Sequence, residues 1–219
     1  MNTYAKEAVG TNYVLQSMRT ARDRTWEVIH EVAARIEPGM LESEATAHCK
    51  TVLNDFGIDR IWHPVLVRFG PNTVKTFKER SDGDPRLDEN DIFFLDLGVV
   101  WEGHEGDAGA TFVVGHDDTM KECAAAAKSV FDEVEGQWRT AKMGGRELYD
   151  FAATCASKLG WTLNLDIKGH RVSDFPHAIY RAGDLGDYED HPNPGLWILE
   201  VQIAHPSLPY GAFYEDLLV

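Results

Sequence analysis

Apolar residues recur at helical spacing in the first part of the chain. Residues 1–36 contain no proline, and among their apolar positions a roughly helical spacing relates Val14, Met18, Trp26, Ile29, Val32 and Ile36. This spacing predicts a long amphipathic helix, which we expect Pro38-Gly39 to end. A second, shorter helix is predicted over residues 42–56, with Gly57 as its end signal.

Runs of apolar, β-branched and aromatic residues follow these helices. They predict strands over residues 63–69, 92–101 and 110–114. The polar stretch at residues 75–90 separates the first two runs and predicts an exposed loop.

The same order of elements then recurs in the second half of the chain. A long helix is predicted over residues 117–142 and a shorter one over 147–159, with Gly144-Gly145 between them. Strands are predicted over residues 161–167, 196–204 and 211–219. This repetition predicts a duplicated helix–helix–strand unit. We expect one α+β domain over residues 1–219, with helices on one face of a mostly antiparallel sheet and a cleft between the halves.

Composition and charge narrow the class of protein. Of the 219 residues 43% are hydrophobic, enough for a sizeable core, and 21 Lys+Arg against 36 Asp+Glu give a net charge of −15. Such an acidic surface argues against nucleic-acid and anionic-membrane partners. The three scattered cysteines favour a reducing compartment. Residues 1–10 lack the pattern of a signal peptide. We therefore expect a cytoplasmic protein without a membrane partner.

Three acidic residues lie within apolar strand-like runs. These are Asp96, Glu200 and Glu215, and a fourth acid, Asp107, follows the glycine-rich turn at residues 103–106. A buried carboxylate must be paired, protonated or bound to metal. Salt bridges are one explanation for each acid, but these segments contain almost no basic residues, so together they favour a metal site. Oxygen ligands with an imidazole suit Mn, Fe, Co or Zn.

Several short motifs together resemble the methionine aminopeptidase and prolidase family, the "pita-bread" metallopeptidases. The segment Leu95-Asp96-Leu97-Gly98, with Gly106-Asp107, is similar to the metal-binding hairpin of that family. Gly169-His170 is similar to its Gly-His motif, and His177 to its substrate-side histidine. Glu200 and Glu215 correspond to its two late carboxylates. The resemblance covers the chain from about residue 10 onwards.

The resemblance implies a pita-bread fold and two divalent metal ions. It implies that Asp96 holds the first metal, that Asp107 and Glu215 bridge both, and that His170 and Glu200 complete the second. Two such ions hold a water and polarise the carbonyl that it attacks. Glu200 is then the candidate proton shuttle. His177 is the candidate group that steadies the carbonyl oxygen or the tetrahedral intermediate.

The substrate side departs from the family pattern. Family peptidases carry a further histidine before the first metal aspartate, whereas residues 71–95 contain none, and His63 is the nearest candidate to replace it. Arg171 is a candidate for binding a substrate carboxylate, and Asp174 for orienting His170 or His177. We expect poor turnover of Met-peptides and X-Pro dipeptides, and a small acidic or zwitterionic substrate.

Three functions remain in competition at this point. The first is a dinuclear metal-dependent hydrolase with aminopeptidase-like chemistry, which cleaves an amide or related C–N bond in a short peptide or small amino-acid derivative. The second is an oxygen-activating di-iron or di-manganese enzyme on the same fold. The third is a non-catalytic binding module, which the retained metal ligands disfavour. A homodimer is compatible with the sequence.

Overall fold

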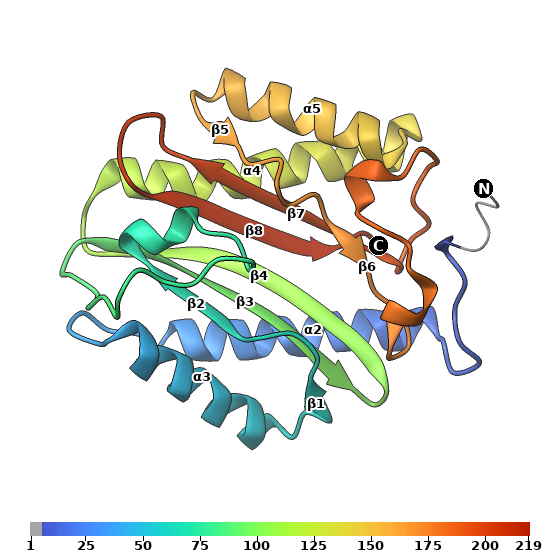
Figure 1. Cartoon of the computed structure of the whole chain (residues 1–219), viewed down its shortest axis with the longest axis horizontal. Helices are drawn as coiled ribbons and strands as arrows, with labels where there is room; N and C mark the ends of the chain where they lie inside the picture. Colours follow the sequence, from blue (N-terminus) through green and yellow to red (C-terminus); the bar gives the residue numbers. More distant parts are fainter. Residues whose placement is uncertain (1–5) are drawn as a thin grey trace.

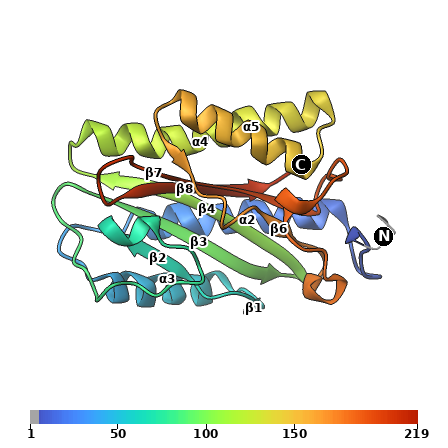
Figure 2. The same ribbon diagram turned by 45° about the horizontal axis from the view of Figure 1, so that its top comes forward.

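Four long helices flank a central sheet in the computed structural model, which describes residues 6–219. They are α2 (Leu15–Ala33), α3 (Glu42–Phe56), α4 (Asp118–Ala141) and α5 (Gly145–Lys158). Helices α2 and α3 pack on the first half of the sheet, and α4 and α5 pack on the second half (Figures 1 and 2). None of the helices in the described part of the chain is long and apolar enough to cross a bilayer.

The strands form one eight-stranded sheet in the order β1-β3-β4-β8-β7-β5, with β2 on β3 and β6 on β7. Every strand pair is antiparallel. The strands are β1 (Arg60–Ile61), β2 (Leu66–Phe69), β3 (Asp91–Trp101), β4 (His104–Val114), β5 (Thr162–Leu163), β6 (His170–Arg171), β7 (Trp197–Ala204) and β8 (Gly211–Leu217). Short 3-10 helices cover Gly70–Val74, His177–Tyr180 and Leu185–Asp187.

The topology repeats across the junction of β4 with β8. In the first half β1 and β2 pair with β3, which pairs with β4; in the second half β5 and β6 pair with β7, which pairs with β8. Each half has its own apolar core, one beneath α2 and α3 and the other beneath α4 and α5. The duplicated α+β architecture predicted from the repeated elements is therefore confirmed.

Side chains of the middle strands point alternately into the core beneath the helices and into the cleft. Leu95 and Leu97 of β3 belong to the first core, and Leu199 and Val201 of β7 belong to the second. Successive side chains of a strand point to opposite faces. The residues between these core positions therefore point away from the helices, and all four helices cover one face of the sheet.

Several predicted boundaries were wrong. Helix α2 ends at Ala33, before Pro38 is reached. The predicted strand over 63–69 shortens to Leu66–Phe69, since residues 63–65 belong to the connection between β1 and β2. The strand predicted to begin at Ala110 begins at His104, because Glu102 and Gly103, both with positive φ, close a tight hairpin. The predicted strand over 161–167 shrinks to Thr162–Leu163.

Candidate metal centre

A row of carboxylates crosses the middle of the sheet on the face opposite the helices. Asp96 of β3 is paired with Gly109 of β4, Gly109 with Glu215 of β8, and Glu215 with Glu200 of β7. Directly opposed residues of paired strands share a face of the sheet. Asp107 lies two residues before Gly109 and so points to the same side. The ladder therefore brings together four acids that are up to 119 positions apart in sequence, from Asp96 to Glu215.

Gly109 leaves room in the middle of this row. A Cβ at this position would lie 2.5 Å from Phe213 Cε1 and 3.0 Å from Glu215 Oε1. Any larger residue would therefore push the Glu215 carboxylate out of line with Asp96.

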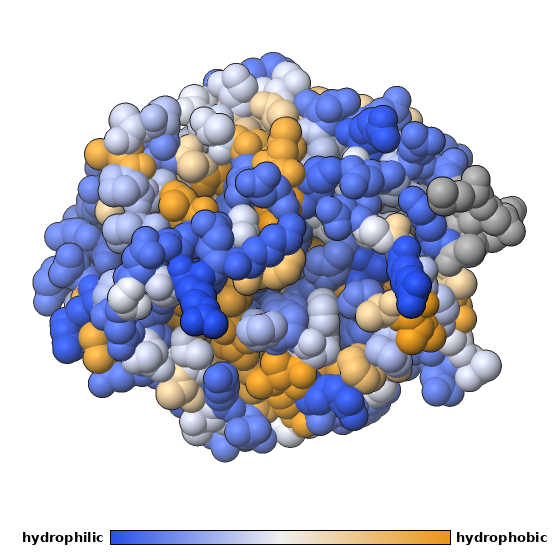
Figure 3. All heavy atoms as spheres, viewed as in Figure 1, coloured by the Kyte–Doolittle hydropathy of each residue, from blue (hydrophilic) through white to orange (hydrophobic). Residues whose placement is uncertain are grey.

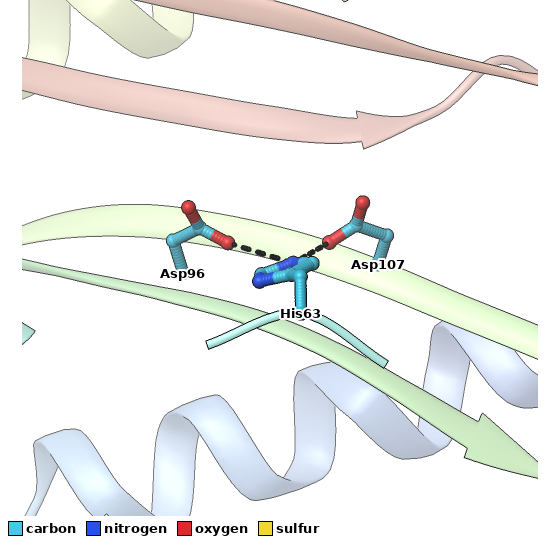
Figure 4. A group of neighbouring side chains, drawn as sticks. All are labelled: His63, Asp96 and Asp107. Carbon is cyan, nitrogen blue, oxygen red and sulfur yellow. Dashed lines mark hydrogen bonds and ion pairs between the residues drawn. The ribbon is translucent and has the colours of Figure 1, made fainter. Parts of the chain in front are cut away.

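Two histidines reach the carboxylates from short outer segments. His170 of β6 places Nε2 2.9 Å from Asp107 Oδ2 and 3.8 Å from Glu200 Oε1. His63, between β1 and β2, places Nε2 3.2 Å from Asp107 Oδ1 and 3.3 Å from Asp96 Oδ1. Figure 4 shows the His63 ring lying between the two aspartates.

Burial disfavours the charged form of Asp96, Glu200 and Glu215. It raises the pKa of Asp96 to about 6 even though the charge of His63 opposes this. Burial and the charges of Asp107 and Asp96 raise the pKa of Glu215 well above its usual range, and burial also raises that of Glu200. Crowded carboxylates resist ionisation unless a cation lies among them.

The histidines supply part of that positive charge. Burial alone would lower the pKa of His63, but Asp96 and Asp107 raise it to about 9. His170 responds in the same way, and its contact with Asp107 raises its pKa to about 10. Both imidazoles in turn outweigh burial at Asp107 and lower the pKa of its carboxyl.

The donor set fits divalent metal ions. Within the described part of the chain, three buried carboxylate oxygens have no hydrogen-bond partner: Asp96 Oδ1, Asp107 Oδ2 and Glu215 Oε1. The nearby histidine nitrogens approach the two aspartate oxygens without hydrogen-bonding geometry. Unsatisfied buried carboxylate oxygens beside imidazole nitrogens are suitable ligands for Mn, Fe, Co or Zn.

Two overlapping groups of side chains are compact enough to hold an ion. One contains His63, Asp96 and Asp107, and the other contains Asp107, His170 and Glu215; the ligand atoms within each group lie within 4.8 Å of one another. Asp107 belongs to both, so its two oxygens can face different ions. Glu200 stands beside the second group, where its Oε2 accepts a hydrogen bond of 2.8 Å from the Gly169 N–H.

Sequence reasoning missed Glu105. This buried residue of β4 accepts the backbone N–H of His177 at 3.0 Å and lies 2.8 Å from its Nδ1. The backbone N–H of Ser173 donates to the same carboxylate. Glu105 thus fixes the His177 ring so that Nε2 is directed away from β4. An acid two residues before Asp107, and so on the same face of the strand, is the signal that could have identified it.

Two predictions about the substrate side were wrong. Arg171 is 2% exposed, and its guanidinium donates to the backbone carbonyls of Lys6, Ala8, Val172 and Leu196. Because His170 faces the carboxylates, the next residue of β6 points to the opposite side. Arg171 therefore anchors the segment around Lys6 and does not meet a ligand in the cleft.

Asp174 does not orient either histidine. Its Oδ1 accepts the N–H of Gly10 at 2.8 Å and the hydroxyl of Ser173 at 2.9 Å. Glu105, and not Asp174, is the acid that holds the His177 ring.

The carboxylates form the floor of a cleft with a volume of about 200 Å³. Figure 3 shows a hollow on this face of the molecule, with hydrophobic residues beside it. Around the floor, Trp62 packs edge-on against His63, His170 and His177, at ring-centroid distances of 4.5, 5.6 and 5.1 Å. The remaining residues that line the cleft are Pro64, Phe77, Lys78, Asp166, Ile167, Lys168, Gly169 and Asp184.

The topology and the site together define an α+β protein whose cleft contains histidines and carboxylates that could hold metal ions. The sequence profile of metallopeptidase family M24 matches residues 16–196. The chain therefore belongs to metallopeptidase family M24, which confirms the resemblance to the methionine aminopeptidase and prolidase family.

Solved structures of the same fold include a prolidase and an X-Pro aminopeptidase. The prolidase from Thermococcus sibiricus is similar with a TM-score of 0.77 at 18% identity, over 99% of this chain and 59% of that one. The X-Pro aminopeptidase from Thermotoga maritima gives a TM-score of 0.70 at 18% identity, over 91% and 56%. These similarities confirm the pita-bread fold.

Curated relatives by sequence include an uncharacterized peptidase of Staphylococcus aureus. It is 24% identical over 101 residues, which are 46% of this chain and 28% of the relative. The chain thus matches less than a third of the length of that relative, and just under three fifths of the Thermococcus prolidase.

Proposed function

We propose that this protein is a dinuclear metal-dependent hydrolase that cleaves an amide or related C–N bond in a short peptide or small amino-acid derivative. The observation that carries the proposal is the pair of overlapping ligand groups that share Asp107. Membership of family M24 supports the metallopeptidase chemistry.

The metal ligands in this proposal are Asp96, Asp107, His170, Glu200 and Glu215. When bound, two divalent ions of Mn, Fe, Co or Zn supply a water of lowered pKa and polarise the carbonyl group of the substrate. The four carboxylates would balance the charge of two such ions, which removes the repulsion that raises the pKa values of Asp96 and Glu215.

Glu200 is the proposed proton carrier. Its place beside the second ligand group suits a group that takes a proton from water and returns it to the leaving amine. The hydrogen bond from Gly169 N–H to Oε2 holds one oxygen of Glu200, and Oε1 faces His170.

His177 is the proposed contact to the substrate oxygen. Glu105 holds its Nδ1 side, so Nε2 is the nitrogen available to the cleft that His177 lines. A fixed donor aimed at the position where negative charge develops lowers the barrier without reorganisation.

The cleft favours a small substrate with an anionic group. Its volume of about 200 Å³ lies below the range of roughly 300–1,000 Å³ that is common for ligand sites. Lys78 and Lys168 line it, and Lys168 is paired with Asp187. Among residues 6–219, the one hydrogen bond of Lys78 Nζ is a 3.5 Å contact with the Asp166 carbonyl. Lys78 is therefore the cation proposed to meet a substrate carboxylate.

A direct test measures, by chromatography, the amino acids, amino-acid amides and ammonia that metal-reconstituted protein releases from each substrate. The panel comprises dipeptides with free and amidated carboxyl termini, X-Pro dipeptides, Met-peptides and amidated amino acids, in air and under anaerobic conditions. We expect metal-dependent release from small substrates with a free carboxylate at equal rates in both atmospheres. Oxygen-dependent turnover, or no turnover of any substrate by protein with both metals bound, would contradict the hydrolase.

A further inference from the structure

His63 and His170 approach the centre in the same way from the two halves of the fold. His63 Nδ1 is 2.9 Å from the carbonyl oxygen of Pro64, and His170 Nδ1 is 2.9 Å from that of Arg171. In both rings Nε2 faces Asp107, on Oδ1 for His63 and on Oδ2 for His170. When Nδ1–H is donated to a backbone carbonyl, the lone pair of the neutral ring lies on Nε2, as in metal-bound histidines.

The fold provides a dedicated space for the His63 ring. Gly98 of β3 lies directly beneath it, and a Cβ on Gly98 would come within 1.9 Å of His63 Cδ2 and 2.2 Å of Nε2. Trp62 packs edge-on against the ring, and the backbone N–H of Trp62 donates to the Gly98 carbonyl at 3.0 Å. The imidazole is thus held against the sheet, with 20% of the side chain exposed.

We propose that His63 is a metal ligand, which gives the Asp96 side of the centre an imidazole of its own. This inference rests on the proposed function, since it requires metals at these carboxylates. The ligand set implied by the family resemblance places its only imidazole, His170, on the second metal. With His63 the centre has one histidine on each side of Asp107, as the two compact groups indicate.

A second imidazole changes which ions the centre prefers. Carboxylate and water ligands suit Mn²⁺, whereas imidazole suits Fe²⁺, Co²⁺ and Zn²⁺. His63 adds a ligand without adding negative charge, so the four carboxylates still balance two divalent ions. The first site should therefore favour Co²⁺ over Mn²⁺ more strongly than a site of carboxylates alone.

The principal experiment compares metal binding by the wild type, His63→Ala and His177→Ala. Chelator-treated proteins are titrated with Co²⁺ and, separately, Mn²⁺, by calorimetry with elemental analysis. We expect two ions per wild-type chain, and at least ~10-fold weaker Co²⁺ binding at one site of His63→Ala, with a smaller loss for Mn²⁺. His177→Ala, which removes the neighbouring imidazole held by Glu105, should bind both ions as the wild type does.

A second measurement avoids substitution of the ligand. NMR of the Co²⁺ form of the wild type should show hyperfine-shifted, solvent-exchangeable imidazole N–H signals from two histidines, because both Nδ1–H groups would lie close to an ion. A signal from one histidine only would overturn the inference. This spectrum remains decisive if His63→Ala folds poorly.

The outcomes separate this inference from the proposed function. If the wild type binds no metal, the proposed function fails and His63 has no ligand role. If the wild type binds two ions and His63→Ala binds them equally well but with a raised KM, His63 contacts substrate and only the ligand role is wrong.

Discussion

The floor and the wall of the cleft are built differently. The floor carries Asp96, Asp107, Glu200 and Glu215 on four neighbouring strands, and none of these residues is more than 9% exposed. The wall comes from short segments outside the long strands, such as residues 62–64, 77–78 and 166–169. Phe77 on the wall is 59% exposed.

Under the proposed function, the floor holds the groups that carry the chemistry, and the wall holds the groups that select the substrate. The backbone hydrogen bonds of the sheet hold the floor, so the spacing of the carboxylates depends little on neighbouring side chains. The wall depends on loops, which tolerate change at lower cost in stability. A substrate preference can therefore change while the metal chemistry is retained.

Asp107→Asn should have the largest effect, because both ligand groups use this carboxylate. We expect loss of bound metal and a fall in kcat of more than ~100-fold, beyond the 10–100-fold typical of residues that only support a ligand. Elemental analysis and kinetics measure both. Asp216→Asn is the matched control: this buried acid is next to Glu215 but pairs with Arg22 on the other face. Retention of metal and activity by Asp107→Asn would show that the floor is not the metal site.

Chelation should destabilise the wild type. A ligand at 100 times its Kd adds about 2.7 kcal/mol to the free energy of unfolding, and for a chain of this size each kcal/mol shifts Tm by about 2–4 °C. We therefore expect chelation to lower Tm by roughly 5–11 °C and to abolish activity, with both restored by Mn, Fe, Co or Zn. Asp107→Asn should show no such shift, and identical melting curves for wild type with and without chelator would argue against metals in the fold.

Glu105→Gln tests the part of the wall that is tied to a strand. The amide would present a donor to His177 Nδ1, where the carboxylate accepts, so the ring should lose its fixed orientation. We expect a fall in kcat/KM of ~10–100-fold with metal content unchanged. Glu122→Gln, on the exposed side of α4, is the control. If Glu105→Gln lowers only Tm, Glu105 is structural and does not position His177.

Lys78→Ala should have the smallest effect. An exposed ion pair contributes at most about 1 kcal/mol, so KM for a substrate with a free carboxylate should rise about fivefold with kcat unchanged. The same substitution should not alter KM for the amidated analogue, and Lys50→Ala on α3 serves as a surface control. Equal effects on both substrates would mean that Lys78 does not recognise the carboxylate.

The sequence by itself determined the acidic floor of the cleft and the outline of the fold. Helix α3 was predicted with its observed bounds, because a glycine in the left-handed conformation ends it at Gly57. Asp96, Glu200 and Glu215 were recognisable because a charged residue within an apolar strand is costly to bury without a partner. Those signals are local, and each can be recognised within a few residues.

Only the tertiary structure decided which residues form the wall of the cleft. A two-residue strand such as β6 is too short for an alternating pattern to show which face of the sheet each side chain points to. The sequence therefore placed Arg171 in the cleft, whereas it faces the opposite side. Glu105 meets His177 across 72 positions, and His63 reaches Asp107 across 44. The first contact forms only when the two halves pair at β4 and β8, and the second forms only when the connection between β1 and β2 lies against Gly98 of β3. Local sequence encodes neither geometry.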